Sequence, residues 1–170
     1  MRNTENYNLF VIFIKENQEK FYRLAYSYVR NRETALDLVQ DAIISALTNL
    51  NKLKNPEYIK TWFYRILVNT CLMYLRKNKS TPDLKILSDD IPVSYDFRKG
   101  IENECVLMAI NKLSPDLKTV VFLRFYEDMK FDEISEVTKI NVNTVKSRIY
   151  KALDLLKSEL GDNFYNENEA

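Results

Sequence analysis

Apolar side chains recur at helical spacing along most of this chain. The most regular run spans residues 35–50, where apolar residues return every three or four positions and would form a continuous buried stripe. Shorter runs, the first two separated by a polar segment, lie at residues 9–14, 21–28, 59–73, 106–113, 117–124 and 145–156. Two glycines and four prolines leave little room for hairpins. The pattern predicts an all-α protein.

Residues that favour helix starts precede three of these runs. Asn55 is followed by proline and glutamate, Ser114 by proline and aspartate, and Asn141 stands directly before the last run. A side-chain oxygen of Asn or Ser can accept a free backbone N–H of the first turn, and proline suits the first helical position. The sequence therefore predicts helices that begin at these three points, the last of them ending at Gly161.

Residues 131–157 read as a short helix, a break and a longer, more basic helix. Apolar residues from Val145 to Leu156 give the second helix one buried face. The side chains expected on or near the opposite face are Asn143, Ser147, Tyr150 and Lys151, with Lys146 and Arg148 on the flanks. Two helices joined by a tight turn, the second polar and cationic, favour a helix-turn-helix that enters the DNA major groove. The alternative is an amphipathic surface helix with solvated charges.

Charge is unevenly distributed although the formal net charge is only +1. Residues 60–79 and 139–157 are basic, whereas residues 81–104 and the tail are acidic. Two basic islands suit a protein that touches a polyanion at two places. The first island interleaves cations with aromatic rings, as single-stranded nucleic acid requires. Trp62 and Phe63 fall on the apolar stripe and favour core packing, while Tyr58, Tyr64 and Arg65 are expected outside it.

Composition argues against several function classes. The chain has no histidine and only Cys71 and Cys105, so we expect neither a metal site nor a cofactor. It has no nucleophile elbow and no phosphate-binding glycine loop, so we expect no enzyme. The N-terminus lacks signal-peptide order and no apolar run is long enough to cross a bilayer. These features predict a cytoplasmic protein that is not membrane-inserted.

Two blocks of the chain resemble the sigma-70 family of bacterial RNA polymerase sigma factors. The segment ALDLVQDAIISAL and the later KNPEYIKTWFYRILVNTCLMYLRK resemble region two, and LSPDLKTVVFLRFYEDMKFDEISEVTKINVNTVKSRIYKALDLLK resembles region four. The chain is too short for the further regions of a housekeeping sigma, so it is similar to the extracytoplasmic function (ECF, group four) class. The implied domains are region two at residues 1–79, a flexible acidic linker at 80–100, region four at 101–160 and a polar tail at 161–170.

The resemblance implies a promoter-specificity subunit with core RNA polymerase and promoter DNA as partners. Region two would dock on the beta-prime clamp helices and region four near the beta flap, and many members are held by a membrane-anchored anti-sigma factor. Carried over by match, the docking residues are Asp37, Gln40 and Asp41. The minus-ten residues are Lys60, Tyr64, Arg65, Asn69, Arg76 and Lys77, with residues 51–57 as the loop that pockets a flipped base. The minus-thirty-five residues are Lys146, Ser147, Tyr150 and Lys151 on bases, with Thr144 and Arg148 on phosphate.

Three positions depart from the family pattern. Lys139 stands where the turn of the motif usually carries glycine, Lys130 where Ser or Thr usually caps, and Met73 where an acid is often found. Lys139 is therefore expected to accept the turn geometry at some strain, unless the turn itself differs. A stand-alone helix-turn-helix regulator is the alternative function, but it gives no reason for an aromatic, cationic helix beside an acidic face.

Overall fold

A computed structural model describes residues 2–79 and 104–161. Its helices are α1 (Arg2–Val29), α2 (Arg32–Thr48), the 3-10 turns η1 (Leu50–Lys52) and η2 (Pro56–Tyr58), α3 (Ile59–Asn78), α4 (Glu104–Asn111), α5 (Pro115–Phe125), α6 (Phe131–Thr138) and α7 (Val142–Leu160). All regular structure in the described ranges is helical, which confirms the predicted fold class. The predicted linker lies outside the described residues, as does the tail after Gly161.

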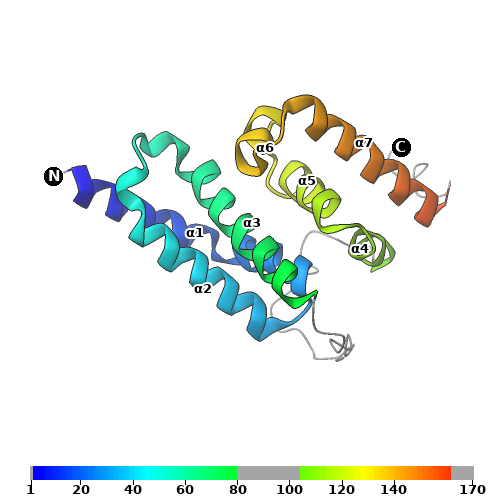
Figure 1. The fold of residues 1–170 in the computed structure, drawn as a ribbon, viewed down its shortest axis with the longest axis horizontal. Coiled ribbons are helices and arrows are strands. Elements are labelled where there is room, and N and C mark those ends of the chain that lie inside the picture. Colours follow the sequence, from blue (N-terminus) through cyan, green and yellow to red (C-terminus); the bar gives the residue numbers. More distant parts are fainter. Residues whose placement is uncertain (1, 80–103, 162–170) are drawn as a thin grey trace.

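Helices α1, α2 and α3 form the first domain around an aromatic core (Figure 1). Phe63 of α3 is fully buried, and its ring centroid lies 5.7 Å from that of Phe10 and 4.6 Å from that of Phe21. The Trp62 ring meets the edge of Phe10 at 6.2 Å. Offset and edge-on ring pairs of this kind stabilise a core beyond the area they bury. The prediction that Trp62 and Phe63 serve packing is confirmed.

Two stretches of this domain add to or depart from what the apolar pattern indicated. The apolar patches at residues 9–14 and 21–28 belong to one continuous helix, α1, because Phe10, Ile14, Phe21 and Tyr28 keep the same helical phase across the polar segment between them. Leu47 was expected in the buried stripe of α2, yet its side chain is 40% exposed. There it lines an open hollow together with Thr4 and Tyr7 of α1, so the contact between α2 and α1 leaves it partly accessible.

Helices α4 to α7 form the second domain, in which α6 and α7 are the helix-turn-helix. Val145 and Ile149 of α7 are buried in the core, and Ala152 and Leu156 continue that face against α4 and α5. The amide N–H of Thr144 donates to Oδ1 of Asn141 at 2.8 Å, so the predicted cap of α7 is confirmed. The recognition helix is thus anchored at its start and along one face.

The other predicted helix starts differ in detail. Oδ1 of Asn55 accepts the N–H of Glu57 at 3.1 Å, as expected for a cap. Ser114 precedes α5 with a first-turn proline, but its side chain makes no capping bond. At α6 the Glu133 carboxylate accepts the backbone N–H of Lys130 at 2.8 Å, which is the half of a capping box that the third helical residue supplies. The Lys130 ammonium only donates, so it cannot accept a backbone N–H in return.

The turn between α6 and α7 confirms the expected strain at Lys139. Its backbone has φ 58° and ψ 30°, the left-handed conformation that glycine adopts most readily. The Lys139 N–H donates to the carbonyl of Ser135 at 2.8 Å. Oγ of Ser135 donates to the carbonyl of Ile140 at 2.6 Å. These bonds hold the turn closed although its central residue is a lysine.

The two domains pack against each other. Figure 1 shows α5 and α6 beside α3 and the end of α1, and residues of both domains contact one another there. Val120, Leu123 and Met129 of the second domain belong to the same buried cluster as the aromatic residues of the first. The two domains therefore share one buried cluster in this arrangement.

Candidate nucleic-acid interface

Helix α7 presents a polar, cationic face opposite its buried stripe. Lys146, Ser147, Tyr150 and Lys151 are all exposed, with 63% of the Tyr150 side chain accessible. A helix with such a face, anchored by a short helix behind it, has the dimensions and chemistry to enter a major groove. The structure therefore brings the four predicted base-facing residues together.

Local contacts already position several of these side chains. The ammonium of Lys146 lies 5.5 Å from the centroid of the Phe131 ring, within cation–π distance. Oγ of Ser147 donates to the carbonyl of Asn143 at 2.8 Å. Lys146 and Ser147 are thus oriented before any ligand arrives.

The two predicted phosphate-contacting residues lie at the flanks of this face. Oγ1 of Thr144 donates to Oδ1 of Asn141 at 3.0 Å, so it forms part of the helix cap. The Arg148 guanidinium lies 3.7 Å from the Asp116 carboxylate at the start of α5. Because Asp116 is largely exposed, this pair contributes little stability, and Arg148 can exchange it for a phosphate.

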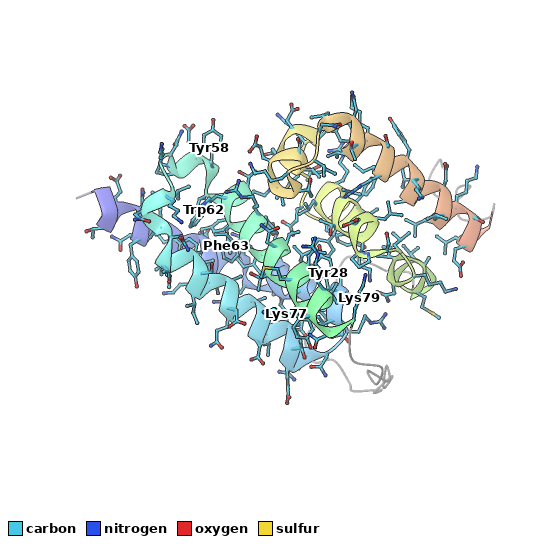
Figure 2. The ribbon with its side chains drawn as sticks, in the orientation of Figure 1. Tyr28, Tyr58, Trp62, Phe63, Lys77 and Lys79 are labelled. Carbon is cyan, nitrogen blue, oxygen red and sulfur yellow. The ribbon has the colours of Figure 1, made fainter. Side chains whose placement is uncertain are left out.

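Helix α3 carries the other predicted contacts along its length. Asn69, Arg76 and Lys77 are exposed, whereas Lys60 and Arg65 are half-buried. Figure 2 places Tyr58 at the beginning of α3 and Lys77 near its end. The predicted residues thus extend over nearly the whole helix. Arg65, Asn69 and Arg76 share one side of it, whereas Lys60 lies on the side that contacts the second domain.

Tyr64 does not lie where the sequence pattern placed it. It was expected outside the apolar stripe, but its side chain is 1% exposed and its ring lies 5.4 Å from that of Phe21. Burial raises the pKa of its hydroxyl far above the usual range. In this arrangement the Tyr64 ring cannot stack on a base.

A pocket lies where the start of α3 faces α6. It has a volume of about 360 Å³ and is lined by Tyr58, Thr61, Trp62, Arg65 and Glu136. Aromatic, hydroxyl and guanidinium groups in one hollow suit a nucleobase and its phosphate. Glu136, from the second domain, closes it from the other side.

A second hollow adjoins the loop expected to hold a flipped base. It has a volume of about 590 Å³ and is lined by Thr4, Tyr7, Leu47, Thr48, Leu50 and Asn51. Only the Asn51 end of the predicted loop takes part. Tyr7 and Thr4 were not foreseen, because the first residues of a helix give no periodic signal of their own.

The acidic face of α2 is exposed as expected, and apolar residues accompany it. Asp37, Gln40 and Asp41 are all exposed, and 58% of the Ile44 side chain is accessible beside them. Leu36, at 48%, lies on the adjoining edge. Apolar side chains rimmed by charges are typical of a protein-binding surface. The sequence pattern grouped Ile44 with neither face, which is why it was missed.

Two buried charged residues at the contact between the domains also escaped prediction. Lys118 of α5 is 6% exposed, and its ammonium donates to the carbonyl of Ser27 at 2.9 Å. Burial lowers the pKa of Lys118 to about 8, with Arg30 adding to the effect. Glu127, in the turn after α5, is 4% exposed. Burial raises the pKa of Glu127, although Lys20, Lys60 and Arg23 oppose the change. A lone charge in a sequence ordinarily predicts exposure, so only the structure reveals these two.

The described residues contain neither a metal-binding cluster nor a membrane-spanning helix. Residues 2–79 and 104–161 bring no three His, Cys, Asp or Glu side chains together in a way that could bind a metal. No helix in the same ranges combines the length and the apolar character needed to cross a membrane.

Two family models match the chain. The model of Sigma-70 region 2 matches residues 13–81, and that of Sigma-70, region 4 matches residues 103–156. The first match contains α2 and α3, and the second contains the helix-turn-helix.

Curated relatives and solved structures agree with these matches. RNA polymerase sigma factor SigV of Bacillus subtilis is 42% identical over 156 residues, covering 89% of this chain and 91% of the relative. The ECF RNA polymerase sigma-E factor of Haemophilus influenzae is 30% identical over 166 residues, covering 89% and 87%. The sigma factor RpoE of Bartonella quintana, solved with the anti-sigma factor NepR, is similar in fold with a TM-score of 0.69 at 22% identity, covering 87% of this chain and 96% of that one. CnrH, solved with the cytosolic domain of CnrY, has a TM-score of 0.66 at 20% identity, covering 89% and 86%.

Proposed function

This chain belongs to the ECF class of the sigma-70 family, and from that premise we propose how its two domains divide the work of promoter recognition. As a member of that class it is a promoter-specificity subunit, which binds core RNA polymerase and directs it to promoter DNA. The domain limits that we propose are residues 1–79 for region two and 101–160 for region four.

Region four reads the minus-thirty-five element as duplex DNA. The observation that carries this assignment is the exposed face of α7, on which Lys146, Tyr150 and Lys151 stand opposite the buried stripe. Lysine can donate to guanine acceptors, and a good base contact discriminates by about 1–3 kcal/mol. Thr144 and Arg148 lie at the flanks and add affinity through phosphate.

Region two holds the minus-ten element as a melted strand. Arg65, Asn69, Arg76 and Lys77 provide a basic track along α3, and the pocket of Tyr58 and Trp62 gives a base a surface to stack on. Flipping a base costs a few kcal/mol, and each stacking contact returns about 1–3 kcal/mol. No ATP-driven step is required for such a trap. Lys60 and Tyr64 join this surface only when the second domain moves away.

The exposed face of α2 docks on the polymerase. Asp37, Gln40 and Asp41 provide charge complementarity to a basic partner surface, and Ile44 provides apolar area that becomes buried. By the family pattern the partner is the beta-prime clamp helices, and region four approaches the beta flap. An anti-sigma factor is a further proposed partner, because two similar structures contain one or a corresponding cytosolic domain.

A binding experiment separates this function from that of a stand-alone regulator. Core RNA polymerase is mixed with the chain and with a promoter premelted at its minus-ten element. The chain should co-purify with core polymerase and start transcription on the premelted template. Tight binding to duplex DNA alone, with no association with the polymerase, would contradict the proposal.

A further inference from the structure

The contact between the domains covers part of the surface that the proposed function assigns to the minus-ten strand. Helix α6 packs on α3, and Glu136 of α6 lines the same pocket as Arg65. Tyr64 is buried beneath the turn that joins α5 to α6. A melted strand therefore cannot reach this end of α3 while the domains are packed.

The turn after α5 occupies a cationic site of the first domain. The Lys60 ammonium donates to the backbone carbonyl of Glu127 at 3.1 Å. The Glu127 carboxyl interacts with Tyr64 and with the positive charges of Lys20 and Arg23. The carbonyl and carboxyl groups of Glu127 thus interact with cationic side chains that could otherwise bind the phosphates of DNA.

Polar contacts fasten the other edge of the same interface. The Lys118 ammonium reaches the carbonyl of Ser27 near the end of α1. Beside it, the hydroxyl of Tyr28 hydrogen-bonds with that of Thr119, and Figure 2 shows Tyr28 where the first domain adjoins α5. The interface therefore contains two groups of polar contacts, one around Glu127 and one around Lys118.

The buried charges make this contact reversible. The Tyr64 hydroxyl and Oε2 of Glu127 are both buried without a hydrogen-bond partner of good geometry among the described residues. Burying a charge or leaving a polar group unsatisfied carries a penalty that water removes when the interface opens. Apolar packing thus favours the closed arrangement while Glu127 and Lys118 limit its stability.

We propose that the free chain inhibits itself through this latch: the Glu127 turn of region four occupies the minus-ten face of region two, and polymerase or promoter must displace it. The proposal rests on the proposed function for the identity of the strand, but the closed state itself does not. Opening releases Lys60, Tyr64 and Arg65 together.

Two substitutions at one position should move the latch in opposite directions. Glu127→Gln keeps the shape of the side chain and removes its buried charge, so the closed form should become more populated. Glu127→Lys places a cation beside Lys20, Arg23 and Lys60, so the open form should gain by roughly a hundredfold. Asp128→Asn and Asp132→Lys change the charge by the same amounts at exposed neighbours and serve as controls.

The first measurement is the radius of gyration of the full chain by small-angle X-ray scattering, without DNA or polymerase. The radius should rise in Glu127→Lys and stay at or below the wild-type value in Glu127→Gln, with both controls unchanged. Equal radii for all chains, or an extended wild type, would overturn the latch. Circular dichroism confirms that each variant is folded. If the Lys variant unfolds, the affinity of the Gln variant for the minus-ten strand still tests the latch.

The second measurement is the affinity for a single-stranded oligonucleotide from the non-template minus-ten region of a promoter that this factor transcribes. Glu127→Gln should bind more weakly than the wild type, and Glu127→Lys more tightly than its Asp132→Lys control. A radius that changes while this affinity does not would refute the minus-ten role of α3 and leave the latch standing. The two failures are therefore distinguishable.

Discussion

The helix-turn-helix turn offers a test of stored backbone strain. Lys139 holds φ 58° and ψ 30°, and two hydrogen bonds around Ser135 prevent the turn from relaxing. A side chain in this region costs about 1–2 kcal/mol, which Lys139→Gly removes. Glycine adds unfolded-state entropy that takes back about 0.4–1 kcal/mol.

The lysine side chain contributes a smaller amount. Its ammonium lies 3.2 Å from the Glu136 carboxylate, but both groups are mostly exposed. Such a pair contributes about 0.2–0.5 kcal/mol. Lys139→Ala loses the pair and keeps the strain, so it should be slightly less stable than the wild type. Lys139→Gly should exceed Lys139→Ala by about 0.5–1 kcal/mol and equal or slightly exceed the wild type.

Urea denaturation followed by circular dichroism measures both differences. Comparing Gly with Ala at one position isolates the backbone contribution, because both variants lack the ion pair. If Lys139→Gly proved no more stable than Lys139→Ala, the left-handed turn would not store the strain inferred here.

Three further outcomes follow from the structure. Asp41→Lys should weaken binding to core polymerase in a competition assay while Asp154→Lys, also exposed, does not; equal affinities would remove Asp41 from the docking surface. Phe63→Ala should cost about 3–5 kcal/mol of unfolding free energy, against little for the exposed Asn69→Ala, and a loss below 1 kcal/mol, on the order of a surface substitution, would refute its central place in the core. Burial between the packed domains lowers the pKa of Lys118 to about 8 from 10.5. The closed arrangement of the domains is therefore most stable at high pH, and this stabilisation is lost as the pH falls through 8. Raising the pH from 7 to 9.5 should therefore reduce the fraction of open molecules, measured by scattering, by roughly 25-fold. Lys118→Met, which leaves Glu127 in place, should lack that change; a flat wild-type profile would contradict the assignment.

Local rules predicted the elements well. The helical spacing of apolar residues located the helix-turn-helix, and Asn55 and Asn141 cap the turns where the sequence placed them. Lys139 was expected to be strained because it stands where the turn of the family usually carries glycine, and its positive φ confirms the left-handed backbone. These features depend only on neighbours within a few residues, so the sequence contains all that they require.

The errors arise where distant segments meet. Tyr64 was predicted to lie outside the core because it falls off the apolar stripe of α3. It is buried by Phe21 of α1 and by the turn that contains Glu127. Lys118 and Glu127 carry charges that predict exposure, and only the packing of the second domain on the first buries them. Periodicity describes one helix at a time and therefore cannot predict a contact between two domains.

The central claim is that α7 and α3 read two separate promoter elements. Single-round transcription with core polymerase tests it on promoters altered in either the minus-thirty-five or the minus-ten element, with the wild type, Lys151→Ala and Arg65→Ala. Lys151→Ala should lose discrimination at minus-thirty-five, worth up to about 1–3 kcal/mol, and keep it at minus-ten. Arg65→Ala should show the reverse pattern. If either variant left both preferences unchanged, or altered both alike, the division of promoter reading between α7 and α3 would be contradicted.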